Sequence, residues 1–238
     1  MRSNPVFREG VAIYWLEHHA FTAYFYLLLI LATIEFLTLF LPAFDPQIWT
    51  GAANLFKISA ISAMILVLYF GLKITNHEYV PWRFAPLKRW IREEGLAVSQ
   101  VALGQLGLLA LHALLLLFVS FPLLLWAGAI ARAPLSSVLV AFGLFLFYAL
   151  VYGVWGLVSL SLWESRFESR QIFIRFFFLC FVFLSALVYL PVNPVAFALS
   201  YLEGREVAVL SHFVFHLALF ATGLGFYIWS LKQKERGP

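Results

Sequence analysis

The sequence predicts an all-α polytopic membrane protein, and three observations lead to that fold class. Hydrophobic residues make up 63% of the 238 residues and charged residues only 12%, whereas a soluble domain is about 45–50% apolar and about 25% charged. The apolar residues form six continuous runs, each long enough to cross a bilayer as a helix. The basic residues gather between alternate runs. This composition excludes a soluble enzyme, a disordered regulator and a nucleic-acid-binding domain, so nucleic acid is not an expected partner.

The six runs are expected to be helical spans of a single transmembrane domain, residues 1–238, surrounded by membrane lipid. Their apolar residues are continuous, whereas a strand of a membrane barrel alternates between apolar and polar positions. The spans are expected at about 20–43, 54–73, 97–121, 136–161, 172–190 and 208–231.

The basic residues predict the orientation of these spans. Only Lys57, Arg132 and Arg205 fall on one side of the predicted bundle, so 13 of the 16 basic residues lie on the other side. Because cytoplasmic segments carry the excess of Lys and Arg, both termini are expected in the cytoplasm.

Residues 1–19 are expected to form a helix that lies in the membrane interface. Asn4 suits the N-cap, and Pro5 suits the first helical position, where its missing N–H costs nothing. Phe7, Val11 and Tyr14 then share one face of an amphipathic helix. The alternative is a polar lead-in to the first span.

The connection over residues 74–96 is also expected to contain a helix. Pro86 can begin it and Gly95 can end it, which gives a short, charged cytoplasmic helix over about 86–95. Such a helix, joined to two spans, would transmit motion from a soluble partner. The alternative is a solvated loop that carries the positive-inside charge.

Residues 191–208, on the outer side, are too apolar for an exposed loop. Asn193 and Pro194 suit the N-cap and first turn of a short helix that ends near Leu202. This piece could dip into the outer leaflet as a re-entrant helix, because its backbone hydrogen bonds are internal. A hairpin on the surface is the alternative.

Glu35 is the one acidic residue deep inside a predicted span, where an ionisable group is costly. Lys57 lies near the outer end of the next span. If these two helices are antiparallel neighbours, the two side chains can form an ion pair, which is the interpretation favoured here. A position facing a substrate path is the alternative.

Three histidines within the spans are candidate ligands. His212 and His216 are four residues apart and share a helix face, while His112 and His216 could lie at matched depth and clamp a b-type haem. A His-x-x-x-His pair could also contribute to a metal site. Interhelical hydrogen bonding is the default interpretation for a histidine in the membrane, and no metal site is expected.

The chain is not expected to be an enzyme. It has no phosphate-binding loop of the G-x-x-x-x-G-K-[ST] type, no G-x-S-x-G and no H-E-x-x-H motif. It therefore lacks the usual means of binding ATP and the usual nucleophile or metal site of a membrane hydrolase. Its single Cys180 excludes an intrachain disulfide.

These segments, taken in order, resemble the membrane permease subunits of ABC-type-2 exporters. NPVFRE at residues 4–9 is similar to the Asn-Pro-x-x-x-(Arg/Lys)-Glu start of such permeases, one residue shorter. IREEGL at residues 91–96 resembles their Glu-x-Glu-x-Gly-Thr-Leu stretch after the second span, with Leu96 in place of Thr. Asn193-Pro194-Val195 is similar to the Asn-Pro that precedes their last helix.

The resemblance implies an N-terminal elbow helix, six spans, a cytoplasmic coupling helix and short outer re-entrant helices. It also implies a homodimer or heterodimer of permeases in the inner membrane of a prokaryote, joined to two separate ATPase subunits that bind ATP and Mg²⁺, with no cofactor in this chain. The coupling helix would offer an aromatic contact and a polar rim to the ATPase, from Arg89, Trp90, Arg92, Glu93 and Glu94.

Two other functions are compatible with the sequence. The three histidines would suit a haem- or quinone-binding membrane anchor of a redox complex. A scaffold or assembly protein without transport is the third possibility. An exporter of amphipathic or bulky cargo is favoured because the spans carry few polar groups.

Overall fold

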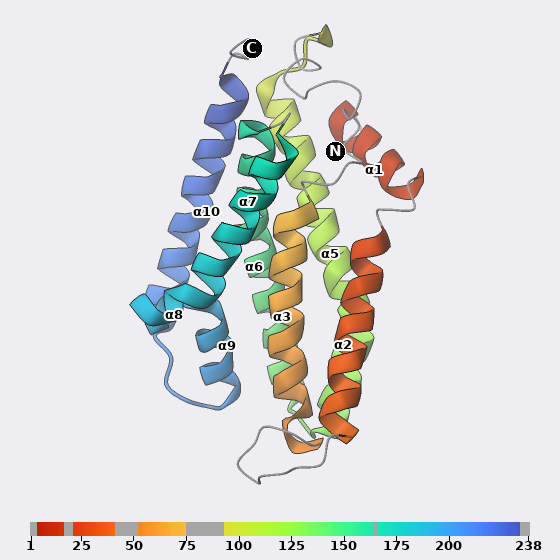
Figure 1. Ribbon diagram of the computed structural model, residues 1–238, viewed down its shortest axis with the longest axis vertical. Coiled ribbons are helices and arrows are strands. Elements are labelled where there is room, and N and C mark those ends of the chain that lie inside the picture. Colours follow the sequence, from red (N-terminus) through yellow and green to blue (C-terminus); the bar gives the residue numbers. More distant parts are fainter. Residues whose placement is uncertain (1–3, 17–20, 41–51, 75–92, 164–165, 234–238) are drawn as a thin grey trace.

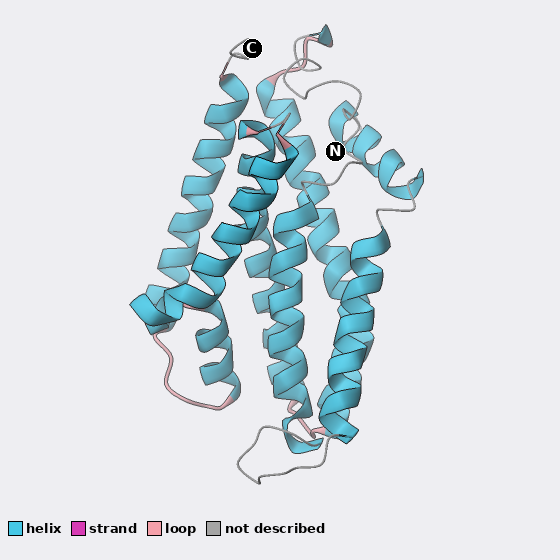
Figure 2. Cartoon of the chain, viewed as in Figure 1, coloured by secondary structure: helices cyan, strands magenta, loops and turns pink. Residues whose placement is uncertain are grey.

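The structure is a computed structural model that describes residues 4–16, 21–40, 52–74, 93–163 and 166–233. Within these ranges the chain is helical apart from short turns, and it contains no strand (Figure 2). Six helical segments are long and apolar enough to cross a membrane. The predicted all-α class, with six helices long and apolar enough to cross a membrane, is therefore confirmed.

Each of the six segments lies over one of the predicted runs. They are α2 (Thr22–Phe40), α3 (Leu55–Ile74) preceded by the 3-10 turn η2 (Ala52–Asn54), α5 (Val98–Ile130), α6 (Leu135–Leu162), the continuous segment of α7 (Phe167–Phe178), the π-helical turn η3 (Leu179–Leu184) and α8 (Ser185–Val188), and α10 (Val209–Lys232).

Helix α6 is the centre of the bundle, with α3, α5 and α10 packed around it (Figure 1). Its Phe145, Tyr148 and Tyr152 are among the largest fully buried side chains of the described residues. The outer faces of the bundle are apolar instead, and Phe118 and Leu187 are 75% and 84% exposed. An inside that is packed and an outside that is apolar are what a lipid solvent requires.

Helix α5 is longer than the sequence predicted. The predicted span ended at residue 121, before Pro122, but the helix continues to Ile130. Proline removes one backbone hydrogen bond, which ends most soluble helices, whereas a transmembrane helix packed among neighbours tolerates it. At 1.5 Å per residue, α5 is about 50 Å long, which exceeds a hydrocarbon core of about 30 Å.

Two of the three short helices predicted outside the spans are present, and most of the third, over about 86–95, lies outside the described residues. The first is α1 (Pro5–Leu16), where the backbone N–H of Phe7 donates to Oδ1 of Asn4 over 3.2 Å. The second is α9 (Pro194–Leu202), where Ala196 N–H donates to Oδ1 of Asn193 over 2.8 Å. The two predicted N-caps are therefore confirmed. The place of either helix relative to the membrane surface stays a prediction.

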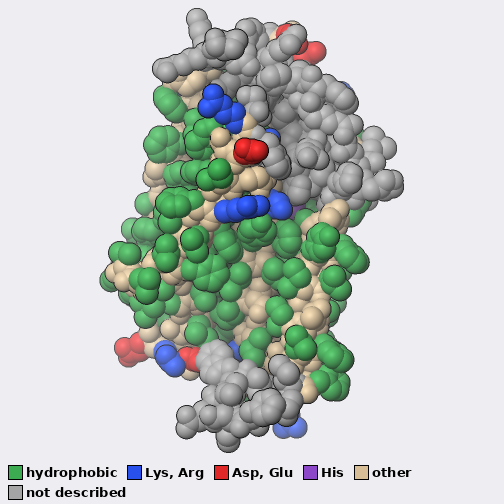
Figure 3. All heavy atoms as spheres, in the orientation of Figure 1, with side chains coloured by type: hydrophobic (Ala, Val, Ile, Leu, Met, Phe, Trp, Pro, Cys, Tyr) green, Lys and Arg blue, Asp and Glu red, His purple; other side chains and the backbone are tan. Residues whose placement is uncertain are grey.

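On the visible face, acidic and basic side chains lie in the upper half and at the lower end, and hydrophobic side chains cover the band between these two groups (Figure 3). Helix α1 and the end of α10 lie at the same end of the bundle, together with the beginning of α5 (Figure 1). The 3-10 turn η2, the α5–α6 turn and the end of α9 lie at the opposite end.

Candidate functional site

The residues predicted to contact an ATPase fall at the edge of what the structure describes. Arg89, Trp90 and Arg92 lie outside the described residues, as does most of the predicted helix 86–95. Glu93 and Glu94 are described and exposed, just before α5. Gly95 follows them with φ of +63°, the left-handed conformation expected where a helix ends at glycine.

The N-terminal helix is attached to the start of α5. The side-chain amide of Asn4 donates to the carbonyl of Gln100 over 2.7 Å. Val6 is fully buried, and a Cβ atom built at Gly104 would lie 2.7 Å from its Cβ. The close approach of the two helices therefore depends on Gly104 having no side chain. Phe7 and Val11, from the predicted apolar face, are only partly buried.

Glu35 is 1% exposed on α2, and neither carboxylate oxygen has a hydrogen-bond partner among the described residues. Ser59 of α3 is a polar neighbour of Glu35, but its buried hydroxyl does not meet hydrogen-bond geometry with the carboxylate. Lys57 is partly buried two residues earlier on α3. The predicted Glu35–Lys57 ion pair stays a prediction.

His212 and His216 meet two tyrosines of α6. The hydroxyl of Tyr148 lies 2.6 Å from Nε2 of His212, and that of Tyr152 lies 3.3 Å from Nε2 of His216. All four residues are fully buried. The ring of Phe197, from α9, is stacked on His212 with centroids 3.8 Å apart. The cluster therefore joins α6, α9 and α10.

These contacts follow from one alignment of two helices. Helices α6 and α10 run in the same direction (Figure 1), and both tyrosine–histidine pairs are 64 residues apart. Nε1 of Trp155 donates to the carbonyl of Leu219 over 3.2 Å with the same separation. A constant separation means that the helices stay in register over two turns.

The third histidine forms a separate pair. Nδ1 of His112, on α5, lies 2.6 Å from the hydroxyl of Tyr24 on α2. Its Nε2 lies 3.3 Å from the carbonyl of Phe70 on α3. His112 therefore joins three helices, and it does not meet the other two histidines.

The hydrogen bonds assign the tautomer of each ring. Nδ1 of His212 faces the carbonyl of Pro191 at 2.8 Å, and Nδ1 of His216 faces that of His212 at 2.9 Å. A carbonyl only accepts, so the nitrogen facing it carries the hydrogen. The other nitrogen is then free to accept from the tyrosine hydroxyl, and a buried neutral ring avoids the cost of a buried charge.

With the same assignment at His112, both nitrogens of all three histidines are engaged. A metal or haem iron would need one of these lone pairs, and each is taken by a tyrosine. The described residues hold no group of three or more His, Cys, Asp or Glu that could bind a metal. The contacts are those of interhelical hydrogen bonds and do not favour a ligand site.

Sequence reasoning missed the tyrosine partners. A signal was present, because Tyr148 and Tyr152 are four residues apart, as are His212 and His216. Two helices with matched four-residue spacings and complementary donors and acceptors can pair along one face. Tyr24, which pairs with a single histidine, carried no comparable signal.

No family model, curated protein or solved structure matches this chain.

Proposed function

We propose that this chain is the transmembrane permease subunit of an ATP-driven exporter. Two separate ATPase subunits, carrying ATP and Mg²⁺, would power a dimer of permeases in the cytoplasmic membrane of a prokaryote. Both termini would lie in the cytoplasm. The cargo would be amphipathic or bulky rather than a small ion.

The observation that carries this proposal is the attachment of α1 to the start of α5. Asn4 and Val6 of α1 contact Gln100 and Gly104 of α5, directly after the charged residues Glu93 and Glu94. A force applied at this end of the bundle would therefore move α1 and α5 together. An element of this kind suits a chain that receives motion from a soluble motor.

The interior of the bundle supports the same proposal. α5 packs against α6, and α6 is tied to α10 by its two tyrosine–histidine pairs. Displacement of α5 would thus reach the bundle centre through packed side chains. The buried histidines donate and accept within the protein, and this favours a mechanical role over a hydrated path for ions inside one chain.

The contact with the ATPase is assigned to Trp90 and Arg92, with Arg89, Glu93 and Glu94 as its rim. Few residues carry most of the energy of a small interface, and tryptophan and arginine are prominent among them. Tagged protein extracted in mild detergent should therefore retain an ATPase of the ABC type. Trp90→Ala with Arg92→Ala should lower that retention at least tenfold without lowering the amount of inserted permease.

The matched control is Trp229→Ala with Lys232→Ala. These residues also combine an exposed tryptophan with an exposed cation, at the same end of the bundle. This control should retain the ATPase at the wild-type level. Full retention by the Trp90–Arg92 variant with normal ATP turnover would place the contact elsewhere, and absence of any ATPase from the wild type would reject the proposed function.

A further inference from the structure

A cavity of about 190 Å³ opens at the end of the bundle opposite α1, between the start of α3 and the turn that joins α5 to α6. Its described lining contains two cations and one hydroxyl, from Lys57, Arg132 and Ser137, and no acidic residue. Apolar side chains, among them Phe56 and Leu202, form the rest of the wall. The lining therefore suits an anionic group that is attached to something apolar.

The charge at this end of the bundle is concentrated at the cavity. Among the residues that the structure describes, three basic residues lie at this end: Lys57, Arg132 and Arg205. One of them, Arg205, is bound to Glu203 at 2.8 Å. Lys57 and Arg132 both line the cavity. Two of the three described cations at this end of the bundle therefore lie at the same cavity.

Arg132 holds its position against a backbone preference. Helix α5 ends with Ala133 N–H bonded to Gly128 O and Arg132 N–H bonded to Ala129 O, the pattern in which glycine is the usual residue. Arg132 has φ of +53° and is the one described residue other than glycine with a positive φ. Glycine would adopt this conformation without steric cost, so the cap alone does not account for an arginine here.

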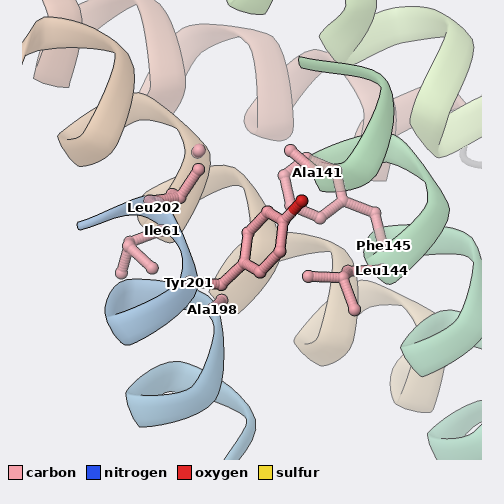
Figure 4. A pocket seen from close by; sticks show the side chains of 8 residues that line it. Ile61, Ala141, Leu144, Phe145, Ala198, Tyr201 and Leu202 are labelled. Atoms are coloured by element: carbon pink, nitrogen blue, oxygen red, sulfur yellow. The ribbon is translucent and has the colours of Figure 1, made fainter. Parts of the chain in front are cut away.

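An apolar recess continues from this cavity along the same two helices. Ala60 and Ile61 of α3 line it one turn after Phe56 and Lys57, and Ala141 of α6 lines it one turn after Ser137. Leu202 of α9 lines both spaces. Figure 4 shows the ring of Tyr201 directed from α9 toward the α6 side of the recess. The recess has a volume of only about 10 Å³, so an acyl chain would lie over it rather than enter the bundle.

We propose that the cavity binds the phosphate of an anionic phospholipid from the outer leaflet, with the start of an acyl chain along the recess. Lys57 and Arg132 would neutralise the phosphate, and Arg132 and the Ser137 hydroxyl would donate hydrogen bonds to it. A soluble phosphate could use the same cations but gains nothing from the adjoining apolar wall. The choice of the outer leaflet rests on the predicted orientation of the spans. The binding itself does not depend on an ATPase.

Native mass spectrometry of the purified chain, titrated with dioleoyl phosphatidylglycerol, tests this assignment. The wild type should retain one lipid at concentrations where dioleoylglycerol, which has the same chains and no phosphate, is not retained. Lys57→Gln with Arg132→Gly should weaken binding at least tenfold. Arg205→Gln, the matched control, removes the third cation of this side and should leave binding within twofold of wild type.

Two further measurements separate a ligand site from a structural one. Arg132→Gly alone should keep or raise the unfolding temperature of the lipid-free protein, because glycine suits the cap, and still weaken binding. Ala141→Leu should fill part of the recess and weaken binding with both cations intact.

Equal binding by the wild type and the Lys57–Arg132 variant would overturn the assignment, as would equal retention of dioleoylglycerol. Inorganic phosphate that raises the unfolding temperature as much as the phospholipid would show an anion pocket without a lipid chain and would also overturn it.

Discussion

The hydroxyl of Tyr148 and Nε2 of His212 are 2.6 Å apart, and both side chains are fully buried. The opposite nitrogen of the ring donates to the carbonyl of Pro191, which leads from η4 (Leu190–Val192) into α9. One imidazole therefore fixes α10 against α6 and against the chain that precedes α9. The energetic value of this arrangement can be measured one hydrogen bond at a time.

Tyr148→Phe should destabilise the protein by about 1–2 kcal/mol, because it leaves Nε2 of a buried histidine without a donor. Tyr152→Phe should cost less, since its hydroxyl lies 3.3 Å from His216, which is long for such a bond. Unfolding free energies in mixed micelles measure both. Equal losses of unfolding free energy in the two variants would mean that the shorter Tyr148–His212 hydrogen bond is not the stronger one.

Glu35→Met should raise the free energy of unfolding, by about 1–3 kcal/mol, if the carboxylate is buried without a hydrogen-bond partner. If Glu35 instead forms an ion pair with Lys57, Glu35→Met should lower the free energy of unfolding, because removing one partner of a buried pair costs about 3–5 kcal/mol. A double-mutant cycle with Lys57→Met distinguishes the two, since independent residues give additive changes. A coupling energy well above 1 kcal/mol would establish the pair.

Gly104→Leu should detach α1 from α5, because even a Cβ at this position would lie 2.7 Å from Val6. We expect faster hydrogen exchange in Pro5–Leu16 and little change in α6. Gly143→Ala is the control, since nothing lies within 4 Å of its added Cβ and alanine favours a helix over glycine by about 1 kcal/mol. Unchanged exchange in α1 would mean that Gly104 is not needed for the contact.

The side chain of Asn193 makes two sets of hydrogen bonds, and substitutions can separate their effects. Its Oδ1 caps α9, while its Nδ2 donates to the carbonyl of Val182 in η3 and to Oγ of Ser185, each over 2.8 Å. Asn193→Asp keeps the cap and loses both donors, so hydrogen exchange should rise in Leu179–Leu184 more than in α9. Asn193→Ala should raise exchange in both, with a cost of about 1 kcal/mol for the cap alone. Identical profiles would indicate one function.

The orientation predicts which single cysteines react from outside intact cells. On a background without Cys180, a cysteine at position 204 should be labelled by an impermeant thiol reagent, whereas one at position 90 should be labelled only after lysis. Labelling of position 90 in intact cells would reverse the orientation, and with it the cytoplasmic contact proposed for Trp90.

The sequence was sufficient for the number of spans because composition and run length alone decide which segments suit a bilayer. It was also sufficient for the caps at Asn4 and Asn193, which depend on neighbours within three residues. The end of α5 was not predictable in this way. Whether Pro122 ends a helix depends on the packing of other helices around it, and that information is spread along the chain.

The sequence likewise identified some residues of the candidate sites and not others. Glu35 and the three histidines were identified because polar residues are rare in spans. Their partners were not, since a tyrosine is common in these helices and its role is decided by helix direction and register. The cavity at Arg132 was missed because it forms from segments that are more than 70 residues apart, such as Lys57 and Arg132.

The shared register of α6 and α10 constrains how this chain can vary in length. One residue inserted between Tyr148 and Trp155 would rotate everything beyond it by about 100° around α6, so a hydrogen bond on the far side would lose its partner. The same insertion after Glu203, before α10 begins, would change the sequence separation of the pairs from 64 to 65 residues and preserve the contacts between α6 and α10. Natural or designed variants should therefore tolerate insertions in the connection and reject them within the paired turns.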